Sequence, residues 1–448
     1  MATKDYVLTC LSPVHIGTGK QFTKLEGLYS DGKWWLVDLD KTLAQEVKAD
    51  ELVLRMNDRG FSWSRFLLSR GIDLSNIASY GLLCSTDPGE LPIREAMKNV
   101  YLQPYIPGSA IKGAIRTAVL WQLITGDASY QAFATQYLTL CLHARELFQE
   151  FRQQYAFDRP DLQQQIMARL FNIPAEEVRG LQQTLYESLD VQKERLPEAR
   201  ESKNFQRALE RLGQKREWLG QPIERAVLGG DPNHDLMRAL QVSDSKPLSI
   251  DLIDIGLIWT YSLDKNRLVE KHDNQGDYRT FAEWISSNAR TAVSIRADEY
   301  LFTDPANSRL KFRGAREQAI RNLAQTCNTY CRSVIRTEKE FYGEHGLYAL
   351  EDFYSDLEEI IESLPQGAFM LNIGWGGGWE FKTLGNLIKQ ILSKPAFNQL
   401  RQRYRLGEDP KTRELHLNAP FPHTRHIAYD GGAPRWSMGW VVLDPLSR

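Results

Sequence analysis

Two basic side chains, Lys112 and Arg116, stand four residues apart in a stretch whose apolar residues recur with helical spacing. Residues four apart share one face of a helix, so both cations would project from the same side. The first turn of a helix also presents backbone N–H groups that no intrahelical carbonyl satisfies. These features together suit a phosphate backbone. An ordinary amphipathic helix whose long cations extend to solvent would show the same spacing, so both interpretations stay open here.

The residues before this helix indicate how it is positioned. An aromatic-rich apolar run, YLQPYI, ends at Ile106 and predicts a strand. Pro107 and Gly108 then predict a turn, and Ser109 is a suitable N-cap for the helix that follows. A strand, a glycine turn and a helix would therefore bring the backbone of Gly108 and Ser109, together with the two cations, to a nucleic-acid phosphate.

A second glycine turn followed by a lysine lies late in the chain, in the sequence GWGGGWEFK at 374–382. Glycines let another backbone or a ligand approach closely, and at least one of Gly376 and Gly377 is expected to have a positive φ. The tryptophan rings beside them could stack on unpaired bases. The pattern fits single-stranded RNA and, equally well, a tight turn with buried tryptophans. The candidate RNA-binding residues of this turn are Gly374, Trp375, Gly376, Gly377 and Lys382.

His15, between Pro13 and Gly17, could act as a general base toward a ribose 2′-hydroxyl in metal-independent RNA cleavage. A lone histidine at a strand end is more often a hydrogen-bonded structural residue. No nucleophile motif or metal-ligand motif accompanies it. We therefore expect no catalytic residue, no metal site and no cofactor, and we keep His15 as a candidate RNA contact.

The glycine-containing segments do not match the known nucleotide-binding motifs. HIGTGK at 15–20 lacks the first glycine of a P-loop, and Gln21 stands where Ser or Thr is required. In the late turn, Trp379 occupies the place of the third glycine of a dinucleotide-binding fingerprint. The sequence therefore argues against both an NTPase and a dinucleotide-dependent enzyme.

The composition is typical of a globular protein in a reducing compartment. The chain has 448 residues, more than one core usually serves, so at least two domains are expected. Its net charge of −2 excludes a broadly basic surface, but not a local track of cations. Five scattered cysteines predict neither disulfides nor a zinc site. No export or membrane-spanning segment is evident, so we expect a cytoplasmic protein without membrane contact.

The pattern of elements divides the chain into four segments. Residues 1–126 contain strands and a few helices, whereas 127–222 are rich in Gln, Glu and Arg and helical in period. Residues 223–248 return to a strand, and 249–448 contain strands, helices and the second glycine turn. Each half thus offers a glycine turn leading into a lysine-bearing helix. This weak repetition suggests two related α+β domains with a helical insertion between or within them.

Five segments taken together resemble the RAMP superfamily of CRISPR-associated proteins. They are LSPVHIG at 11–17, YIPGSAIKGAIR at 105–116, DLMRALQVSDS at 235–245, IGWGGGWEFKT at 373–383 and MGW at 438–440. Their order and spacing are most similar to those of the fifth Csm subunit of type III-A effector complexes. The uninterrupted glycine run at 376–378 departs from the usual pattern, in which a bulkier residue often breaks it.

The resemblance implies an α+β fold with two RRM-related, ferredoxin-like (RAMP) domains and a large helical insertion. It implies a non-catalytic RNA-binding subunit that caps the filament of backbone subunits at the 3′ end of the CRISPR RNA (crRNA) and supports crRNA maturation in antiviral defence. The implied partners are crRNA, neighbouring RAMP subunits and a host trimming nuclease. By position, both glycine turns, Lys112 and Arg116 would contact RNA. The alternative is a metal-independent endoribonuclease that trims crRNA, with His15 as the general base.

Overall fold

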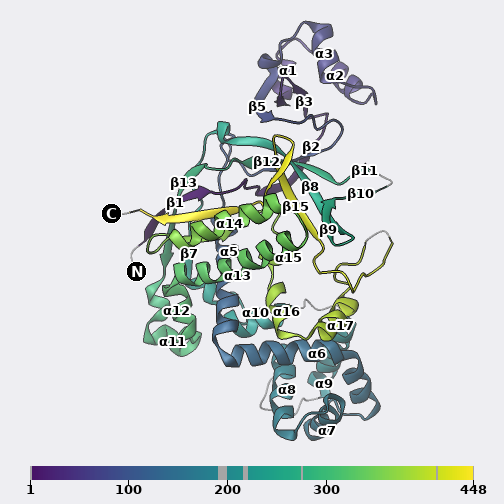
Figure 1. The fold of residues 1–448 in the computed structure, drawn as a ribbon, viewed down its shortest axis with the longest axis vertical. Coiled ribbons are helices and arrows are strands. Elements are labelled where there is room, and N and C mark those ends of the chain that lie inside the picture. Colours follow the sequence, from purple (N-terminus) through teal and green to yellow (C-terminus); the bar gives the residue numbers. More distant parts are fainter. Residues whose placement is uncertain (1–2, 190–198, 215–219, 274–275, 410–411, 447–448) are drawn as a thin grey trace.

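The computed structural model describes residues 3–189, 199–214, 220–273, 276–409 and 412–446. The architecture is mixed α+β, as the sequence predicts. Two curled sheets occupy the middle of the molecule, a small lobe projects at one end, and a group of helices forms the other end (Figure 1). The strands that build both sheets come from distant parts of the sequence.

The first sheet has five antiparallel strands in the order β14-β17-β1-β13-β7. Strand β1 follows the alternation of YVLTC, which buries every second side chain. Helices α5 (Gly108–Gly126) and α13 (Leu323–Glu344) pack against this sheet, and α14 (Tyr348–Ser363) packs against α13. The strands are β1 (Lys4–Cys10), β7 (Leu240–Val242), β13 (Arg290–Ala297), β14 (Phe369–Asn372) and β17 (Trp440–Pro445).

The second sheet is built around the long strand β8 (Ile253–Asp264), whose apolar density predicts a core strand. Its main path runs β2-β6-β12-β8-β5-β4-β3, with β9 and β15 also paired to β8, and β16 to β15. The other strands are β2 (Gly17–Phe22), β3 (Gly27–Ser30), β4 (Lys33–Val37), β5 (Ala78–Cys84), β6 (Ile93–Ala96), β9 (Arg267–Glu270), β12 (Arg279–Ile285), β15 (Thr424–Asp430) and β16 (Ala433–Trp436).

Both sheets join strands from the N-terminal and C-terminal segments. In the first sheet, β1 lies between β13 and β17. In the second, β5 and β6 pair in parallel with β8 and β12. Residues 1–126 and 249–448 are therefore not separated in the hydrogen bonding of the sheets. The four-segment division stays a prediction about domains.

The small lobe has its own hydrophobic core under short helices (Figure 1). Trp63 and Phe66 pack edge to face at its centre. Gly71 ends one helix with a φ of 63°, in the left-handed region that favours glycine. The helices are α1 (Leu39–Leu43), α2 (Ala49–Met56), α3 (Trp63–Arg70) and α4 (Leu74–Ile77).

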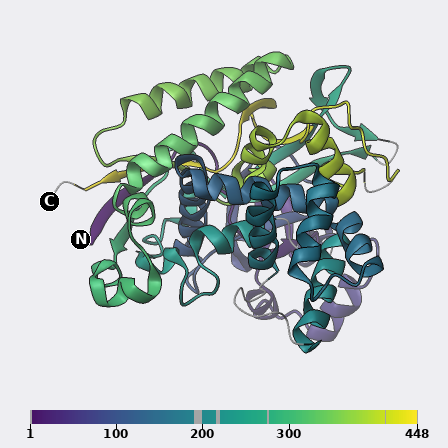
Figure 2. The same cartoon turned by 90° about the horizontal axis from the view of Figure 1, so that it is seen from below.

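The predicted helical stretch at 127–222 is confirmed over its described residues. Its helices pack side by side below the sheets (Figures 1 and 2), around aromatic residues such as Phe151 and Phe205. No helix of the described residues is long and apolar enough to cross a bilayer. The helices are α6 (Ala128–Gln153), α7 (Pro160–Phe171), α8 (Ala175–Ser188), α9 (Ala199–Gly213) and α10 (Gln221–Leu228).

The remaining elements lie mainly in the C-terminal half. The lysine-bearing helix after the second glycine turn is short: α15 ends at Lys382 and α16 begins at Gly385, because Thr383 and Leu384 leave the helical conformation. The remaining helices are α11 (Asp304–Leu310), α12 (Ala315–Arg321), α15 (Gly378–Lys382), α16 (Gly385–Ile391) and α17 (Lys394–Tyr404), and β10 (His272–Asp273) pairs with β11 (Gly276–Asp277).

The predicted strand ending at Ile106 is wrong. Residues 101–107 form a turn and an irregular segment, with a single bridge between Lys98 and Pro104. The side chain of Asn99 accepts hydrogen bonds from the backbone N–H groups of Tyr101 and Gln103, which closes the turn. Proline cannot donate to a strand ladder, and two prolines lie in this run. The apolar residues of this run are therefore not paired in a strand.

Candidate nucleic-acid interface

Helix α5 begins two residues earlier than the sequence predicts, and Ser109 is not its N-cap. Pro107 occupies the N-cap position, where no side chain caps the helix. The N–H of Gly108 instead donates to Asp244 Oδ1 at 2.7 Å. A Cβ on Gly108 would lie 2.4 Å from the carbonyl oxygen of Val242. Gly108 therefore serves close packing against the 235–245 motif, while Ser109 stays exposed.

Lys112 and Arg116 share a face of α5 but differ in their partners. Arg116 forms an ion pair of 2.6 Å with Asp235 and one of 3.4 Å with Glu224. Lys112 makes no hydrogen bond or ion pair with another residue that the structure describes. Burial lowers the pKa of Lys112, Asp235 opposes that shift, and the charge of Arg116 adds to it. Lys112 is thus the cation of this face that remains available for an anion.

The late glycine turn is joined by backbone hydrogen bonds to two other motifs of the resemblance. The N–H of Trp375 donates to the carbonyl oxygen of His15 at 2.7 Å. The N–H of Gly439 donates to Pro13 at 2.9 Å, and its carbonyl oxygen accepts from Ile373 at 2.7 Å. Three segments far apart in the sequence, at 11–17, 373–383 and 438–440, therefore meet in one place.

The glycines of this turn make room mainly for the protein itself. Gly374 has a φ of 72°, and a Cβ there would lie 2.4 Å from the carbonyl oxygen of His15. Gly376 has a φ of 106° and lies against Met438, which confirms that one of Gly376 and Gly377 needs a positive φ. Gly377 has a φ of −71°, and the space that a side chain would occupy there is filled by Asn372 and Phe381. The close approach predicted from the glycines is thus filled from within.

Two histidines and an arginine from the second sheet and the β1–β2 connection lie against the ring of Trp375. His426 stacks on it with centroids 4.8 Å apart, and His15 meets it edge to face at 6.1 Å. The guanidinium carbon of Arg94 lies 4.7 Å from the ring centroid. The sequence did not mark Arg94 or His426 at this site, because a single Arg in IREA and a single His in TRHIAYD carry no distinguishing pattern.

His15 is buried, with 2% of its surface exposed. Its Nδ1 donates to the carbonyl oxygen of Glu283 at 2.6 Å. Burial lowers the pKa of His15; the bond to Glu283 opposes this shift, and Arg94 and Lys98 add to it. A buried, neutral imidazole bonded to the backbone can hold strands together, but it lacks the access that a general base toward an RNA hydroxyl requires.

The side chain of Glu283 fixes the sheet beneath His15. Its carboxylate accepts hydrogen bonds from Tyr80 at 2.8 Å and from the N–H of Ala96 at 2.8 Å, and it forms a buried ion pair with Lys98. A buried carboxylate needs such partners, since an unpaired charge would cost several kcal/mol. His15 is therefore held by a strand whose position is itself fixed by a satisfied ionic cluster.

Lys382 lies at the end of the short helix α15 and has no ion-pair or hydrogen-bond partner among the described residues. Its side chain reaches solvent, yet desolvation by the surrounding protein lowers the pKa of its amine to about 8. The neighbouring Trp379 packs edge to face on Phe421 at 5.0 Å and against Gly385. Lys382 can therefore receive an anion, whereas Trp379 is engaged in packing.

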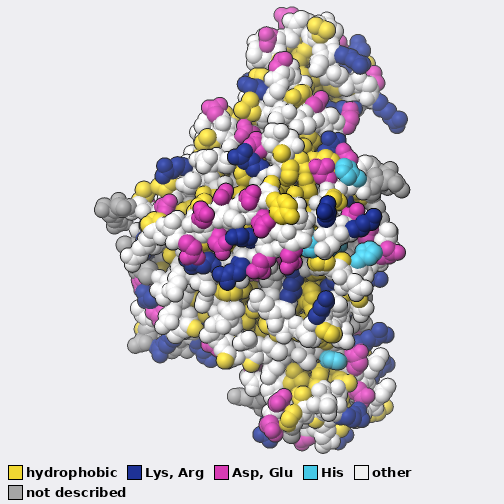
Figure 3. Space-filling model, in the orientation of Figure 1, with side chains coloured by type: hydrophobic (Ala, Val, Ile, Leu, Met, Phe, Trp, Pro, Cys, Tyr) yellow, Lys and Arg dark blue, Asp and Glu magenta, His cyan; other side chains and the backbone are white. Residues whose placement is uncertain are grey.

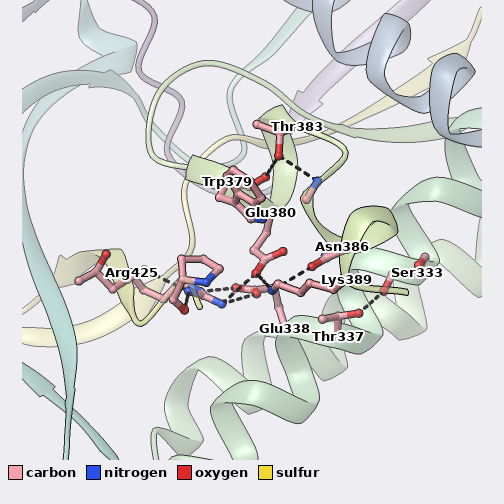
Figure 4. Close-up of polar contacts among 12 residues, drawn as sticks. Ser333, Thr337, Glu338, Trp379, Glu380, Thr383, Asn386, Lys389 and Arg425 are labelled. Atoms are coloured by element: carbon pink, nitrogen blue, oxygen red, sulfur yellow. Dashed lines mark hydrogen bonds and ion pairs between the residues drawn. The ribbon is translucent and has the colours of Figure 1, made fainter. Parts of the chain in front are cut away.

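An ionic cluster holds α15 in place (Figure 4). Glu338 of α13 accepts two hydrogen bonds of 2.8 Å from Arg425 of β15, and Lys389 of α16 donates to Glu380 of α15 at 2.9 Å. Glu380 also lies 3.7 Å from Arg425. Burial raises the pKa of Glu380, and Lys389 opposes that shift. The cluster ties two helices and a strand to the end of the glycine turn.

The described residues offer no group of three His, Cys, Asp or Glu side chains arranged to hold a metal ion. In the 229–235 loop, His234 bonds to Asp231 at 2.6 Å, while Asp235 pairs with Arg116. Acidic and basic side chains are interspersed over the face drawn in Figure 3, with no broad field of one sign. A phosphate contact on this face would therefore come from individual cations.

Comparison with known proteins gives a consistent result. A sequence model described as the RAMP superfamily matches residues 7–382. Over 130 residues the chain is 29% identical to "CRISPR system Cms protein Csm5" of Streptococcus thermophilus, an alignment that covers 25% of this chain and 36% of that protein. The aligned part thus spans about a third of the length of that relative.

Two solved structures share the fold. One is a chain of the cryo-EM structure of a Csm–crRNA–target RNA ternary complex of a type III-A CRISPR-Cas system, with a TM-score of 0.64 and 22% identity over 99% of this chain and 100% of that chain. The other is the crystal structure of T. onnurineus Csm5, with a TM-score of 0.56 and 21% identity over 97% of this chain and 99% of that chain.

Proposed function

Because this chain belongs to the RAMP superfamily, we propose that it is the Csm5-like subunit of a type III-A CRISPR effector complex. In this role it binds crRNA, caps the filament of backbone subunits at the crRNA 3′ end, and supports crRNA maturation in antiviral defence. The observation that carries the proposal is the match of nearly the whole fold to a chain of a Csm–crRNA–target RNA complex. The meeting of three sequence motifs around Trp375 supports it.

The proposed fold contains a ferredoxin-like unit dispersed along the chain. Six elements that other elements separate in the sequence have the chain order strand, helix, strand, strand, helix, strand; they are β1, α5, β7, β13, α13 and β14. Their strands lie side by side as β14-β1-β13-β7 once β17, which lies between β14 and β1, is set aside. A second such unit would use the strands of the larger sheet, with the helices of 127–222 as the insertion.

The proposed RNA contacts are Lys112, Lys382 and the surroundings of Trp375, since the two lysines lack protein partners among the described residues. The exposed Ser109 is a further proposed contact. Gly108, Gly374, Gly376 and Gly377 would shape the two turns that carry these contacts, and Arg116 would hold α5 in place through its ion pairs. The proposed partners are crRNA, neighbouring RAMP subunits and a host trimming nuclease. We also propose a cytoplasmic location, which fits five cysteines that are all free and buried.

The proposed role is not catalytic. The burial of His15 and its bond to the Glu283 carbonyl oxygen favour a structural role over proton transfer. Cleavage of crRNA by His15, without a metal, is the alternative.

Purification of the tagged chain from its native host, followed by sequencing of bound small RNAs, tests the proposal. We expect RAMP subunits and RNAs that share one repeat-derived 5′ tag. Recovery of the chain without RNA would overturn the central claim.

A further inference from the structure

Three arginines of the described residues lie over tryptophan rings, an arrangement that attracts a cation to the ring face. The distances are measured from the guanidinium carbon to the ring centroid. They are 4.7 Å for Arg94 over Trp375, 5.6 Å for Arg279 over Trp259, and 5.0 Å for Arg435 over Trp436. The three pairs are alike in ring contact and can therefore be compared by their other partners.

Arg94 differs from the other two in having no acid partner. Arg279 lies 3.4 Å from Asp277, and Arg435 forms an ion pair of 2.9 Å with Asp430. Arg94 forms no ion pair or hydrogen bond with any residue that the structure describes, and its Nε is buried without a hydrogen-bond partner. A guanidinium with five N–H donors and no acceptor is an incomplete site for an anion.

The sheet presents Arg94 close to an open edge. Arg94 is paired in register with Gln21 of β2 and Ala282 of β12, so these three side chains share one face. Strand β2 is the edge of the sheet and is exposed along most of its length. Arg94 itself is half-buried, one strand in from the edge. A bound chain could reach it across β2.

The groups around Arg94 leave its charge uncompensated. Burial lowers the pKa of His426 to about 4, with Arg94 as the charge that contributes. Burial also lowers the pKa of His15, to which the charges of Arg94 and Lys98 contribute. Lys98 is already neutralised by Glu283. The charge left without a counter-ion is that of Arg94.

We propose that Arg94 binds a phosphodiester group of RNA on the face of the second sheet, with Trp375 holding the guanidinium flat and Gln21 at the open edge. This inference rests on the proposed function and adds the residue that receives the phosphate. Arginine matches two phosphate oxygens with parallel N–H donors, which a lysine cannot do. The contact reads no base, so it would act alike on every crRNA sequence.

The first test uses the purified full chain and a fluorescent eight-nucleotide oligouridine RNA. We expect Arg94→Ala to weaken binding roughly tenfold, as for a lost charged hydrogen-bond pair, and to reduce the slope of log affinity against log salt by about one. Arg435→Ala is the matched control, because Arg435 also lies over a tryptophan but has an acid partner. We expect this control to bind as the wild type does.

The second test needs no variant. The pKa of the His426 ring is measured by NMR titration of the wild-type chain, with and without the same RNA. A phosphate at Arg94 would offset the neighbouring positive charge, so the pKa of His426 should rise on binding. For the Arg94→Ala variant of the first test, near-UV circular dichroism checks that the packing of the tryptophans is kept.

The outcomes separate the two proposals. If the wild-type chain binds RNA while Arg94→Ala binds equally well and the pKa of His426 stays constant, the Arg94 inference is overturned and the proposed function stands. If the wild-type chain binds no RNA, alone or in its native complex, the proposed function fails and the Arg94 inference fails with it.

Discussion

The two glycine turns that precede a lysine look alike in sequence and differ in structure. The first opens the 19-residue helix α5, which packs on the five-stranded sheet. The second leads into the five-residue helix α15, which ends at Lys382. At both turns a glycine is required because another part of the same chain comes close, at Val242 for Gly108 and at His15 for Gly374.

The comparison of the two turns shows how much a glycine turn before a lysine says about a ligand. The missing side chain of a glycine at a turn indicates that some backbone is near, but not whether that backbone belongs to the protein or to a ligand. Here it belongs to the protein at both turns. The cations left for a ligand are those without partners among the described residues, Lys112 in the first unit and Lys382 in the second.

The largest expected effects are on stability. Gly374→Ala should lower the free energy of unfolding by about 2–5 kcal/mol, because it combines a positive φ with a clash against the backbone of His15. Gly108→Ala, which meets the backbone of Val242 without such a φ, should cost about 1–3 kcal/mol. Urea unfolding midpoints at constant slope measure both.

Gly113 provides the control for these two variants. It lies exposed within α5, and a Cβ there would meet nothing within 4 Å. Gly113→Ala should therefore stabilise the chain by about 0.5–1 kcal/mol through helix propensity. Equal small changes at Gly108, Gly113 and Gly374 would mean that the turns are not packed as described.

The second expected effect concerns RNA affinity and separates Lys112 from Arg116. Lys112→Ala should weaken the binding of any RNA sequence and reduce the salt slope by about one. Arg116→Ala should leave that slope unchanged and lower stability by less than about 1 kcal/mol, because it breaks partly exposed ion pairs with Asp235 and Glu224. Fluorescence anisotropy at several salt concentrations distinguishes the two. An equal loss of slope in both variants would mean that Arg116 leaves Asp235 to bind RNA.

The third expected effect is a pH dependence at Lys382. The pKa of its amine is lowered to about 8, so the free chain loses this charge as the pH rises through 8. A phosphate stabilises the charged form and raises that pKa. Affinity for RNA should therefore be highest below pH 8 and decline between pH 7 and pH 9. Lys382→Arg keeps its charge and should bind with constant affinity over this range. A decline of the same size in Lys382→Arg would assign the pH dependence to another group.

The sequence predicted the elements better than it predicted their partners. Alternation predicts β1, apolar density predicts β8 and helical spacing predicts α5, because these signals depend only on which side of an element is buried. The cap of α5 was missed, since Asp244 reaches Gly108 from the irregular segment after β7, more than 130 residues away. Such contacts depend on tertiary structure and leave no local signal.

The same limit applies to the candidate site. His15, Gly374 and Trp375 were each selected for a local pattern, and the structure brings all three together. Arg94 and His426 complete that cluster, and neither has a pattern of its own. The ion pairs of Arg116 could not be foreseen either, because its spacing from Lys112 describes one helix face and not what packs against it.

The smallest expected effect is at His15, where we expect no change in RNA cleavage. Its Nδ1 donates to Glu283, and the ring is nearly inaccessible to an RNA hydroxyl. The wild-type chain should leave crRNA intact with or without Mg²⁺, and His15→Ala should leave mature crRNA lengths unchanged. His15→Asn, whose amide can also donate to the Glu283 carbonyl oxygen, is the control for folding. Loss of a buried histidine could lower stability by itself, so lengths are compared at matched levels of folded protein. Cleavage at a defined position by the wild type, abolished in both variants while they remain folded, would instead establish His15 as the general base of a ribonuclease.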